Sequence, residues 1–184
     1  MQFYEKTLNT TSIYQGKIIS VEVAEVELPN GKRAVRELVR HPGAVAIIPF
    51  TDEGRLVLVR QFRKPLDKEI FEIPAGKLEK GEDPSVTAQR ELVEETGYHA
   101  EKMRLVTSFY TSPGFADEIL YIFEAEGIKE GQKRTEEDEF VETYIFTLEE
   151  ALDLMASQKI HDAKTAFAIM YWQNKILNQK LGSR

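Results

Sequence analysis

The sequence predicts an α+β fold, because short strand-like segments joined by tight turns dominate it and helical segments are scattered among them. Most of these segments alternate apolar and polar residues, and short connections link them, which is typical of antiparallel strands. The chain has 184 residues, about the size of one domain and enough to bury a single sizeable core.

The first predicted unit is a β-hairpin. Residues 17–28 place β-branched residues in near alternation, and Pro29-Asn30-Gly31 is a strong turn signal before a return strand at 33–40. Since an isolated two-stranded hairpin is marginal in water, we expect this one to pack against something else.

The end of this hairpin is also the predicted domain boundary. Pro42-Gly43 interrupts the strands there. We therefore predict a β extension at residues 1–40, followed by the main domain at 41–184.

The main domain opens with a second hairpin, in which an apolar run at 44–50 is joined by a turn at 51–54 to an alternating strand at 55–62. Further short strands are predicted at 70–73, 104–111, 118–125 and 140–146.

Three helices interrupt these strands. The first is bounded by Asp83 as N-cap, Pro84 at the first helical position and Gly97 as the stop. Capping signals also predict helices at 148–157 and from 163 to about 180.

Composition excludes several classes of function. Asp and Glu total 31 against 24 Lys and Arg, a formal net charge of -7, which argues against general nucleic-acid binding. Without cysteine, disulfides and thiolate catalysis are excluded. No apolar stretch is long enough for a membrane span, and no secretory signal is visible, so we expect a cytoplasmic protein.

The chemically informative segment is the first helix. Glu91, Glu94 and Glu95 are three and four residues apart, so they share one helical face. Clustered carboxylates suit hard divalent cations. The alternative is a solvated acidic face with Arg90 as a local ion-pair partner, which the three glutamates alone would favour.

The full spacing around these glutamates decides between the two interpretations. It fits the signature G-x5-E-x7-R-E-U-x-E-E-x-G-U, where U is a bulky apolar residue, and the sequence thereby resembles the Nudix hydrolase family. The matching positions are Gly76, Glu82, Arg90, Glu91, Leu92, Glu94, Glu95, Gly97 and Tyr98. Tyr98 departs slightly from the pattern, since an aliphatic residue is commoner there.

The resemblance implies a Nudix α/β/α sandwich with a mixed sheet, and a hydrolase that uses Mg²⁺, for which Mn²⁺ can substitute. It implies metal ligands at Glu91 and Glu95, with Glu94 in the cluster and the main-chain carbonyl of Ala75 completing the set. Arg90 would orient the glutamates. A net acidic protein needs such ions to screen an anionic pyrophosphate.

The residues of this signature, 76–98, are called the box below. Segments outside the box resemble the ADP-ribose pyrophosphatase subfamily. They are 41–45, 59–65, 72–76 and 110–115. This resemblance implies a small nucleotide substrate, ADP-ribose, hydrolysed to AMP and ribose 5-phosphate. The alternatives are a pyrophosphatase for another nucleoside diphosphate sugar such as GDP-mannose, or a non-catalytic Nudix-fold ligand sensor, which would usually have lost box glutamates.

The same resemblance implies the residues that bind substrate. Arg63 would bind phosphate, although it could instead be a surface cation near Asp67. The other predicted substrate-binding residues in the main domain are Lys77, Ser112, Pro113, Gly114 and Glu118.

The resemblance also implies a homodimer that exchanges the N-terminal hairpin, so that Arg36 reaches the neighbour's ligand. An exposed hairpin arginine is the equally plain interpretation of Arg36. Ile19, Val21 and Val23 offer an apolar face for packing, and closed two-fold dimers are the commonest homo-oligomers.

A hydrolase also needs a group that activates water. The acidic run 136–139 precedes a predicted strand, where related enzymes carry a catalytic glutamate on a loop. We predict Glu137 and Glu139 as the candidates, one as base and one as metal ligand, with Glu139 included in the metal set. His41 and His161 are less favoured, because nothing around them indicates a site.

Overall fold

The computed structural model describes residues 3–133 and 140–182. Its N-terminal part is a three-stranded antiparallel sheet in the order β1-β2-β3, made of β1 (Lys6–Gln15), β2 (Ser20–Glu27) and β3 (Arg33–Arg40). The β2–β3 hairpin is the predicted one. The expected two-stranded unit is corrected to three strands, because β1 is fully exposed along its length and carries no apolar alternation that could have predicted it.

The main domain contains two further sheets. A mixed four-stranded sheet has the order β7-β4-β9-β8, with β4 and β9 parallel and the other pairs antiparallel. An antiparallel sheet has the order β10-β5-β6. The strands are β4 (Ala44–Pro49), β5 (Leu56–Arg63), β6 (Lys68–Glu72), β7 (Ala75–Lys77), β8 (Tyr98–Tyr110), β9 (Ile119–Glu130) and β10 (Glu142–Phe146), and a short 3₁₀ helix η1 (Lys64–Leu66) separates β5 from β6.

All three predicted helices are present. In α1 (Pro84–Thr96), the Asp83 side chain accepts the Ser85 N–H and Gly97 ends the helix in the left-handed region. Helix α2 (Leu148–Ala156) starts with the expected capping box of Thr147 and Glu150. Helix α3 covers Ala163–Gly182.

Two predicted strands are longer in the structure, and one further strand of the main domain was not predicted. Strands β8 and β9 are much longer than the expected 104–111 and 118–125, because their outer halves pair with each other and one face of that ribbon packs with α1 through residues such as Tyr98 and Ile128. Strand β7 was not predicted, since its three residues form no pattern and are recruited by pairing with β4.

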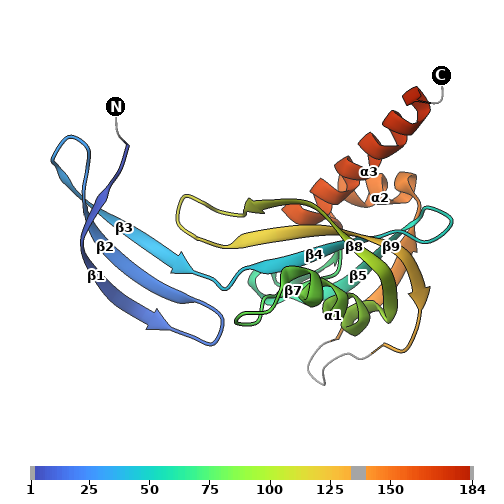
Figure 1. Cartoon of the computed structure of the whole chain (residues 1–184), viewed down its shortest axis with the longest axis horizontal. Coiled ribbons are helices and arrows are strands. Elements are labelled where there is room, and N and C mark those ends of the chain that lie inside the picture. The colour runs from blue at the N-terminus through green and yellow to red at the C-terminus, as the bar shows by residue number, and fades with distance from the viewer. Residues whose placement is uncertain (1–2, 134–139, 183–184) are drawn as a thin grey trace.

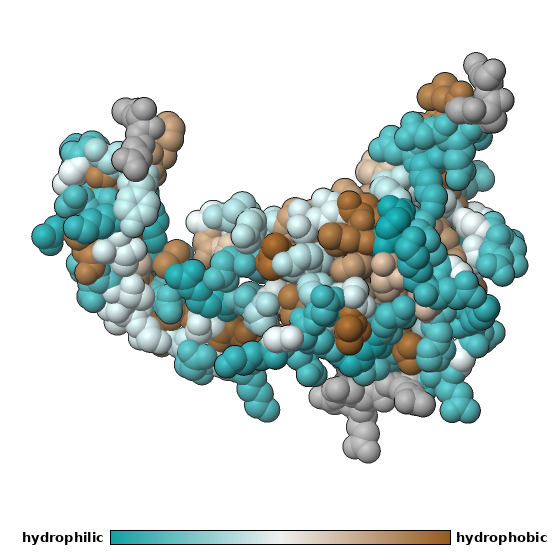
Figure 2. Space-filling model, in the orientation of Figure 1, coloured by the Kyte–Doolittle hydropathy of each residue, from teal (hydrophilic) through white to brown (hydrophobic). Residues whose placement is uncertain are grey.

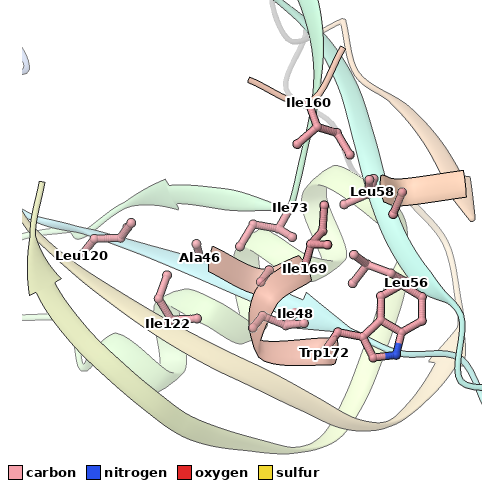
Figure 3. Packing of buried hydrophobic residues seen from close by; sticks show 12 residues of the cluster. Ala46, Ile48, Leu56, Leu58, Ile73, Leu120, Ile122, Ile160, Ile169 and Trp172 are labelled. Carbon is pink, nitrogen blue, oxygen red and sulfur yellow. The ribbon is translucent and has the colours of Figure 1, made fainter. Parts of the chain in front are cut away.

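Helices cover both faces of the main-domain sheets. Alternate residues of β4 point to opposite faces: Val45 and Ile47 pack with Leu92 of α1, whereas Ile48 packs in the other cluster with Ile169 and other residues of α3. Figure 3 shows the α3 side of the core. The result is an α/β/α sandwich with a mixed sheet, as the resemblance implied.

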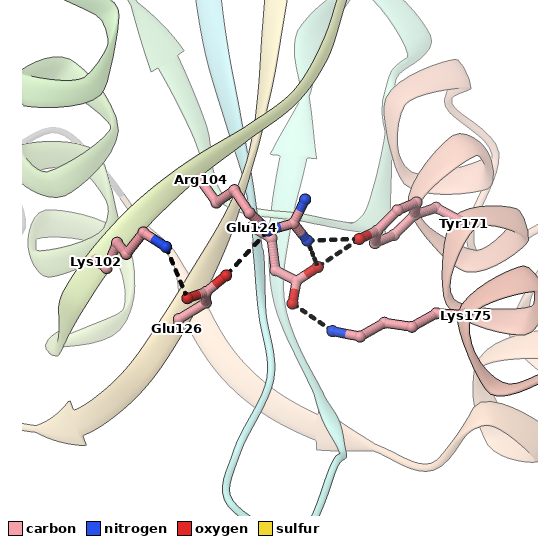
Figure 4. Close-up of polar contacts among 6 residues, drawn as sticks. All are labelled: Lys102, Arg104, Glu124, Glu126, Tyr171 and Lys175. Carbon is pink, nitrogen blue, oxygen red and sulfur yellow. Dashed lines mark hydrogen bonds and ion pairs between the residues drawn. The ribbon is translucent and has the colours of Figure 1, made fainter. Parts of the chain in front are cut away.

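A polar network also fastens α3 to the sheet (Figure 4). The carboxylate of Glu124 on β9 is only 5% exposed, and it pairs with Arg104 of β8 at 2.6 Å. It also accepts hydrogen bonds from Tyr171 at 2.6 Å and from Lys175, both on α3. Burial, followed by the hydrogen bond to Glu124, raises the pKa of Tyr171. Because each charge of this network is paired, its burial is tolerated.

The N-terminal sheet projects from the main domain as an arm (Figure 1). Its base is held by the loop after β8: the Val39 N–H donates to the Phe115 carbonyl at 2.8 Å, and Asp117 pairs with Arg40 at 3.1 Å. The arm exposes large apolar side chains among polar ones (Figure 2), including Ile13, Tyr14 and Val35. In the described part of the chain, no helix is both long and apolar enough to cross a membrane.

Candidate active site

A pocket of about 740 Å³ lies where α1, β7 and the start of α3 meet the sheets. Its lining includes two of the box glutamates, Glu91 and Glu95, and the loop residues Ala75 and Gly76. The lining also contains cations, so the pocket brings acidic and basic side chains together. Its basic residues are Arg63, Lys77 and Lys164.

The metal-binding candidates converge at the β7 end of this pocket. Glu91 and Glu95 are one helical turn apart on α1, and their side chains face β7. The Glu95 side chain is buried and accepts the Ala75 N–H at 3.0 Å. Gly76 lies so close to Glu91 that a Cβ built on it would be 1.9 Å from the carboxyl carbon. A glycine is therefore required there for the carboxylate to sit against the backbone.

Arg90 organises the opposite side of the same helical turn. It binds Glu82 at 3.3 Å, Glu91 at 2.7 Å and Glu94 at 2.9 Å. Burial lowers the pKa of Arg90, but the hydrogen bonds and charges of these carboxylates outweigh it, so that the net pKa is raised. The Arg90 hydrogen bond, and one from Thr87, lower the pKa of Glu82. These contacts are the local ion pairs considered for Arg90, and the orienting role implied for it stays a prediction.

Glu94 occupies a different position from the other two glutamates. It bonds Arg90 and is not part of the pocket lining. Within residues 3–133 and 140–182, no group of three or more His, Asp or Glu side chains is placed to hold a metal ion. The candidate donors at this end of the pocket are the carboxylates of Glu91 and Glu95, and the role implied for the Ala75 carbonyl stays a prediction. These are all oxygen donors, and their chemistry fits a hard divalent cation that keeps part of its water shell.

Arg63 is the last residue of β5 and lines the pocket. Its Nε donates to Glu72 at 2.7 Å, whereas Asp67 pairs with Lys64 at 2.8 Å. Arg63, which could have been a surface cation near Asp67, is therefore paired with Glu72 instead. Lys77 also lines the pocket, with an exposed side chain.

The predicted substrate turn lies beside the pocket instead of lining it. Ser112, Pro113 and Gly114 are absent from the described lining, while Thr111 and Glu118 on either side belong to it. Thr111 Oγ1 donates to Glu118 at 2.5 Å, which joins the two strands at the pocket mouth.

Arg36 lies in the N-terminal arm and not in the pocket of its own chain. Its Nε donates to Glu5 Oε2 at 2.9 Å and its Nη2 donates to Glu5 Oε1 at 2.5 Å, which makes a bidentate salt bridge within the arm. The hydrogen bond to Glu5 and its charge raise the pKa of Arg36. A role for Arg36 in a neighbour's site stays a prediction.

His41 was not expected at the site, yet it lines the pocket. Its Nδ1 accepts the Gly43 N–H at 3.1 Å and lies 3.6 Å from Glu118. Nothing in the sequence around His41 indicated this, because Glu118 is brought to it by β9. His161, in contrast, contacts Lys68 at 3.2 Å.

Sequence reasoning also missed pocket residues at the start of α3 and on β5. Asp162 and Lys164 were interpreted only as parts of a helix start, and Gln61 as part of a strand. The Nε2 atom of Gln61 and the Oδ2 atom of Asp162 are buried without a hydrogen-bond partner among the described residues. Glu137 and Glu139 lie outside the described residues.

Comparison with known proteins assigns the class of protein to which this fold and site belong. A NUDIX domain model matches residues 40–167, and a model of the nucleoside diphosphate sugar hydrolase N-terminal domain matches residues 5–39. The chain belongs to the Nudix family, and the resemblance in its sequence is confirmed.

Two bacterial relatives resemble nearly the whole chain. The ADP-ribose pyrophosphatase of Bacillus subtilis (strain 168) is 57% identical over 173 residues, which cover 93% of this chain and 94% of the relative. The methanol dehydrogenase activator of Bacillus methanolicus is 54% identical with the same coverage. A crystal structure of an ADP compounds hydrolase superposes with a TM-score of 0.82 at 22% identity, covering 96% of this chain and 95% of that one, and it confirms the fold.

Proposed function

We propose that this protein hydrolyses the pyrophosphate bond of ADP-ribose to AMP and ribose 5-phosphate with the help of divalent metal ions. The observation that carries the proposal is the meeting of Glu91, Glu95 and the Ala75 backbone with Arg63 in one pocket. The Bacillus subtilis relative, which is named an ADP-ribose pyrophosphatase, supports the choice of substrate.

The metal would be Mg²⁺, with Mn²⁺ as a substitute. Glu91, Glu95 and the Ala75 carbonyl would hold it, and we retain Glu94 and Glu139 as further members of the set. When bound, the metal screens the pyrophosphate charge and makes water a better nucleophile. Arg90 keeps Glu91 and Glu94 in place through its paired N–H groups.

The remaining pocket residues bind and orient the substrate. Arg63 and Lys77 offer N–H donors to the oxygens of a diphosphate, and Lys77 also brings positive charge into the pocket of a protein of net charge -7. Glu118, held by Thr111, can accept hydrogen bonds from sugar hydroxyls. The turn of Ser112, Pro113 and Gly114 is proposed to border that sugar.

A substrate panel tests this function directly. Purified protein is incubated with ADP-ribose or GDP-mannose, in Mg²⁺ or in EDTA, and the nucleoside monophosphate formed is measured. We expect turnover of ADP-ribose that requires metal. Faster turnover of GDP-mannose would favour the other nucleoside diphosphate sugar, and no turnover of either would favour a ligand sensor.

We further propose the boundary between a β extension at 1–40 and a Nudix domain at 41–184, a cytoplasmic location, and a homodimer that exchanges the extension. The arm in Figure 1 supports exchange, because it buries little of itself against its own main domain and exposes apolar side chains such as Ile13 and Val35. No nucleic acid or membrane partner is proposed.

The acidic loop gives a prediction on the chemical step. Glu137→Gln and Glu139→Gln are made separately, and at least one should lower kcat by roughly 10²-fold with KM little changed, in line with general-base contributions. Single-turnover and steady-state rates in Mg²⁺ provide the measurement. Normal kcat in both variants would place the base elsewhere.

Exchange of the arm predicts recovery of activity in a mixed dimer. One chain carries Arg36→Ala and the other Glu95→Gln, each with its own affinity tag. If Arg36 completes the partner's site, one site receives both lesions and the other none. Because one of the two sites in each mixed dimer then carries no lesion, about half the wild-type activity per dimer should return.

The controls are the two parent homodimers and Arg33→Ala, an exposed arm variant expected to be fully active. Sedimentation at micromolar concentration establishes the assembly first. A monomer in solution, full activity of the Arg36→Ala homodimer, or no recovery in the mixed dimer would contradict the exchanged arrangement.

A further inference from the structure

Four charged side chains form a continuous chain of contacts behind the phosphate-binding end of the pocket. Arg63 Nε donates to Glu72 Oε2 at 2.7 Å, and Lys164 Nζ donates to Glu72 Oε1 at 2.5 Å. Lys164 Nζ also donates to Asp162 Oδ1 at 2.9 Å. The four residues come from β5, β6 and the start of α3, and nothing in the local sequence connects them.

We propose that Lys164 is a positioning residue that acts through Glu72 to hold the Arg63 guanidinium in the orientation that binds the substrate's diphosphate. This inference rests on the proposed function for the identity of the substrate. It gives a role to Lys164, Glu72 and Asp162, which belong neither to the box nor to the predicted substrate-binding residues.

The Arg63 guanidinium is fixed through its Nε. A guanidinium is planar, so fixing the Nε–H bond fixes the plane and the direction of the outer Nη groups. Within the described residues, neither Nη of Arg63 forms a hydrogen bond. Those two nitrogens carry four N–H donors, and they belong to a side chain that lines the pocket and is 38% exposed. A diphosphate entering the pocket can therefore use the outer edge of the fork.

Glu72 is buried and paired with two cations. Its side chain is 3% exposed, and each carboxylate oxygen has its own cation, Oε2 with Arg63 and Oε1 with Lys164. Without Lys164, one oxygen of a buried carboxylate would lose its donor. Glu72 would then rotate toward Arg63 to use both oxygens, and the guanidinium would turn with it.

The start of α3, which carries Lys164, is held in place by hydrogen bonds. Asp162 Oδ1 accepts the Thr165 N–H at 3.2 Å as well as the Lys164 bond. The buried Thr165 hydroxyl accepts the Ile73 N–H at 3.0 Å, which ties α3 to the segment that leads into Ala75. Further along, Trp172 packs in the core (Figure 3). Lys164 is thus anchored to fixed backbone and does not depend on a mobile loop.

The charges of the cluster indicate that it orients the Arg63 guanidinium and does not serve to attract phosphate. Two carboxylates, Glu72 and Asp162, balance two cations, Arg63 and Lys164. The cluster therefore adds no net positive charge to the pocket. If Lys164 served only to attract phosphate, Asp162 beside it would work against that purpose.

A double-mutant cycle on ADP binding tests the proposal. Calorimetry in Mg²⁺ buffer compares wild type, Lys164→Met, Arg63→Ala and the double variant. Lys164→Met should weaken ADP binding by about tenfold when Arg63 is present and by less than about twofold in the Arg63→Ala background, a coupling of the size found for residues of one salt-bridge network. Lys164→Arg, which keeps the charge and the donor, should restore binding to within about threefold of wild type.

Equal weakening in both backgrounds would overturn the proposal, because a purely structural loss does not depend on Arg63. No weakening by Lys164→Met would overturn it as well. Thermal melts accompany each variant, and Lys164→Leu, which likewise has no donor, replaces Lys164→Met in the cycle if the latter does not fold. Lys68→Met is the matched control, since Lys68 contacts His161 and not Glu72, and it should bind ADP as wild type does.

Turnover of ADP-ribose gives the second readout. Lys164→Met should raise KM by about tenfold with kcat changed by less than about threefold, as expected for loss of binding that is uniform between ground and transition state. If wild type does not hydrolyse ADP-ribose, the proposed function fails, while the ADP cycle still decides the role of Lys164. If wild type turns over and the cycle is additive, only the role of Lys164 fails.

Discussion

Glu95→Gln should reduce turnover of ADP-ribose by roughly 10³-fold or more at saturating Mg²⁺, because the loss of a carboxylate ligand removes several kcal/mol of metal-dependent stabilisation. Glu95 is buried against the Ala75 N–H, and the glutamine carbonyl oxygen can still accept that bond. The fold should therefore survive. With one like charge fewer at i,i+4 spacing from Glu91, the melting temperature without metal should be unchanged or slightly higher.

The measurement pairs steady-state rates over a range of Mg²⁺ concentrations with a thermal melt in EDTA. Glu149→Gln provides the matched control, because it removes an exposed helical carboxylate from α2 and should be as active as wild type. Near-wild-type turnover by a folded Glu95→Gln protein would show that the metal site is not on this face of α1.

The local parts of this molecule were predictable because their signals lie within a few residues. Asp83 marks the start of α1 and Gly97 its end, because both are capping residues. The spacing of Glu91 and Glu95 places them on one face of the helix, whatever the helix packs against. The family and the mixed-sheet sandwich followed from the box and are confirmed by the comparisons. The hairpin turn at 29–31 likewise appears as predicted.

The parts that escaped prediction depend on contacts between distant segments. Lys164 and Glu72 are 92 residues apart, and His41 meets Glu118 only because the loop after β8 folds back onto the base of the arm. Strand β1 escaped for a different reason. Its side chains are exposed throughout, so backbone pairing to β2 holds it and no buried face shapes its sequence.

Gly76→Ala tests the close approach of backbone and carboxylate that defines the site. The φ angle of Gly76 lies outside the left-handed region, so alanine is not barred by backbone conformation there. The added Cβ would instead fall between 1.9 and 2.3 Å from the three carboxyl atoms of Glu91. Because that carboxylate is the far end of a flexible side chain, it moves and the backbone stays.

We therefore expect Gly76→Ala to fold with little loss of stability and to lose at least roughly 10²-fold in kcat/KM, the cost of misplacing a catalytic group by about 1 Å. Titration with Mn²⁺ should show weaker metal activation than in wild type, since Glu91 has left its place. Gly54→Ala provides the opposite control: its Cβ meets nothing within 4 Å, but its φ of +72° costs a non-glycine residue about 1 kcal/mol of stability. That variant should melt earlier and remain fully active. If Gly76→Ala kept wild-type activity and metal dependence, Glu91 would not need its position against the loop, and the assignment of Glu91 and the Ala75 carbonyl to one metal ion would be wrong.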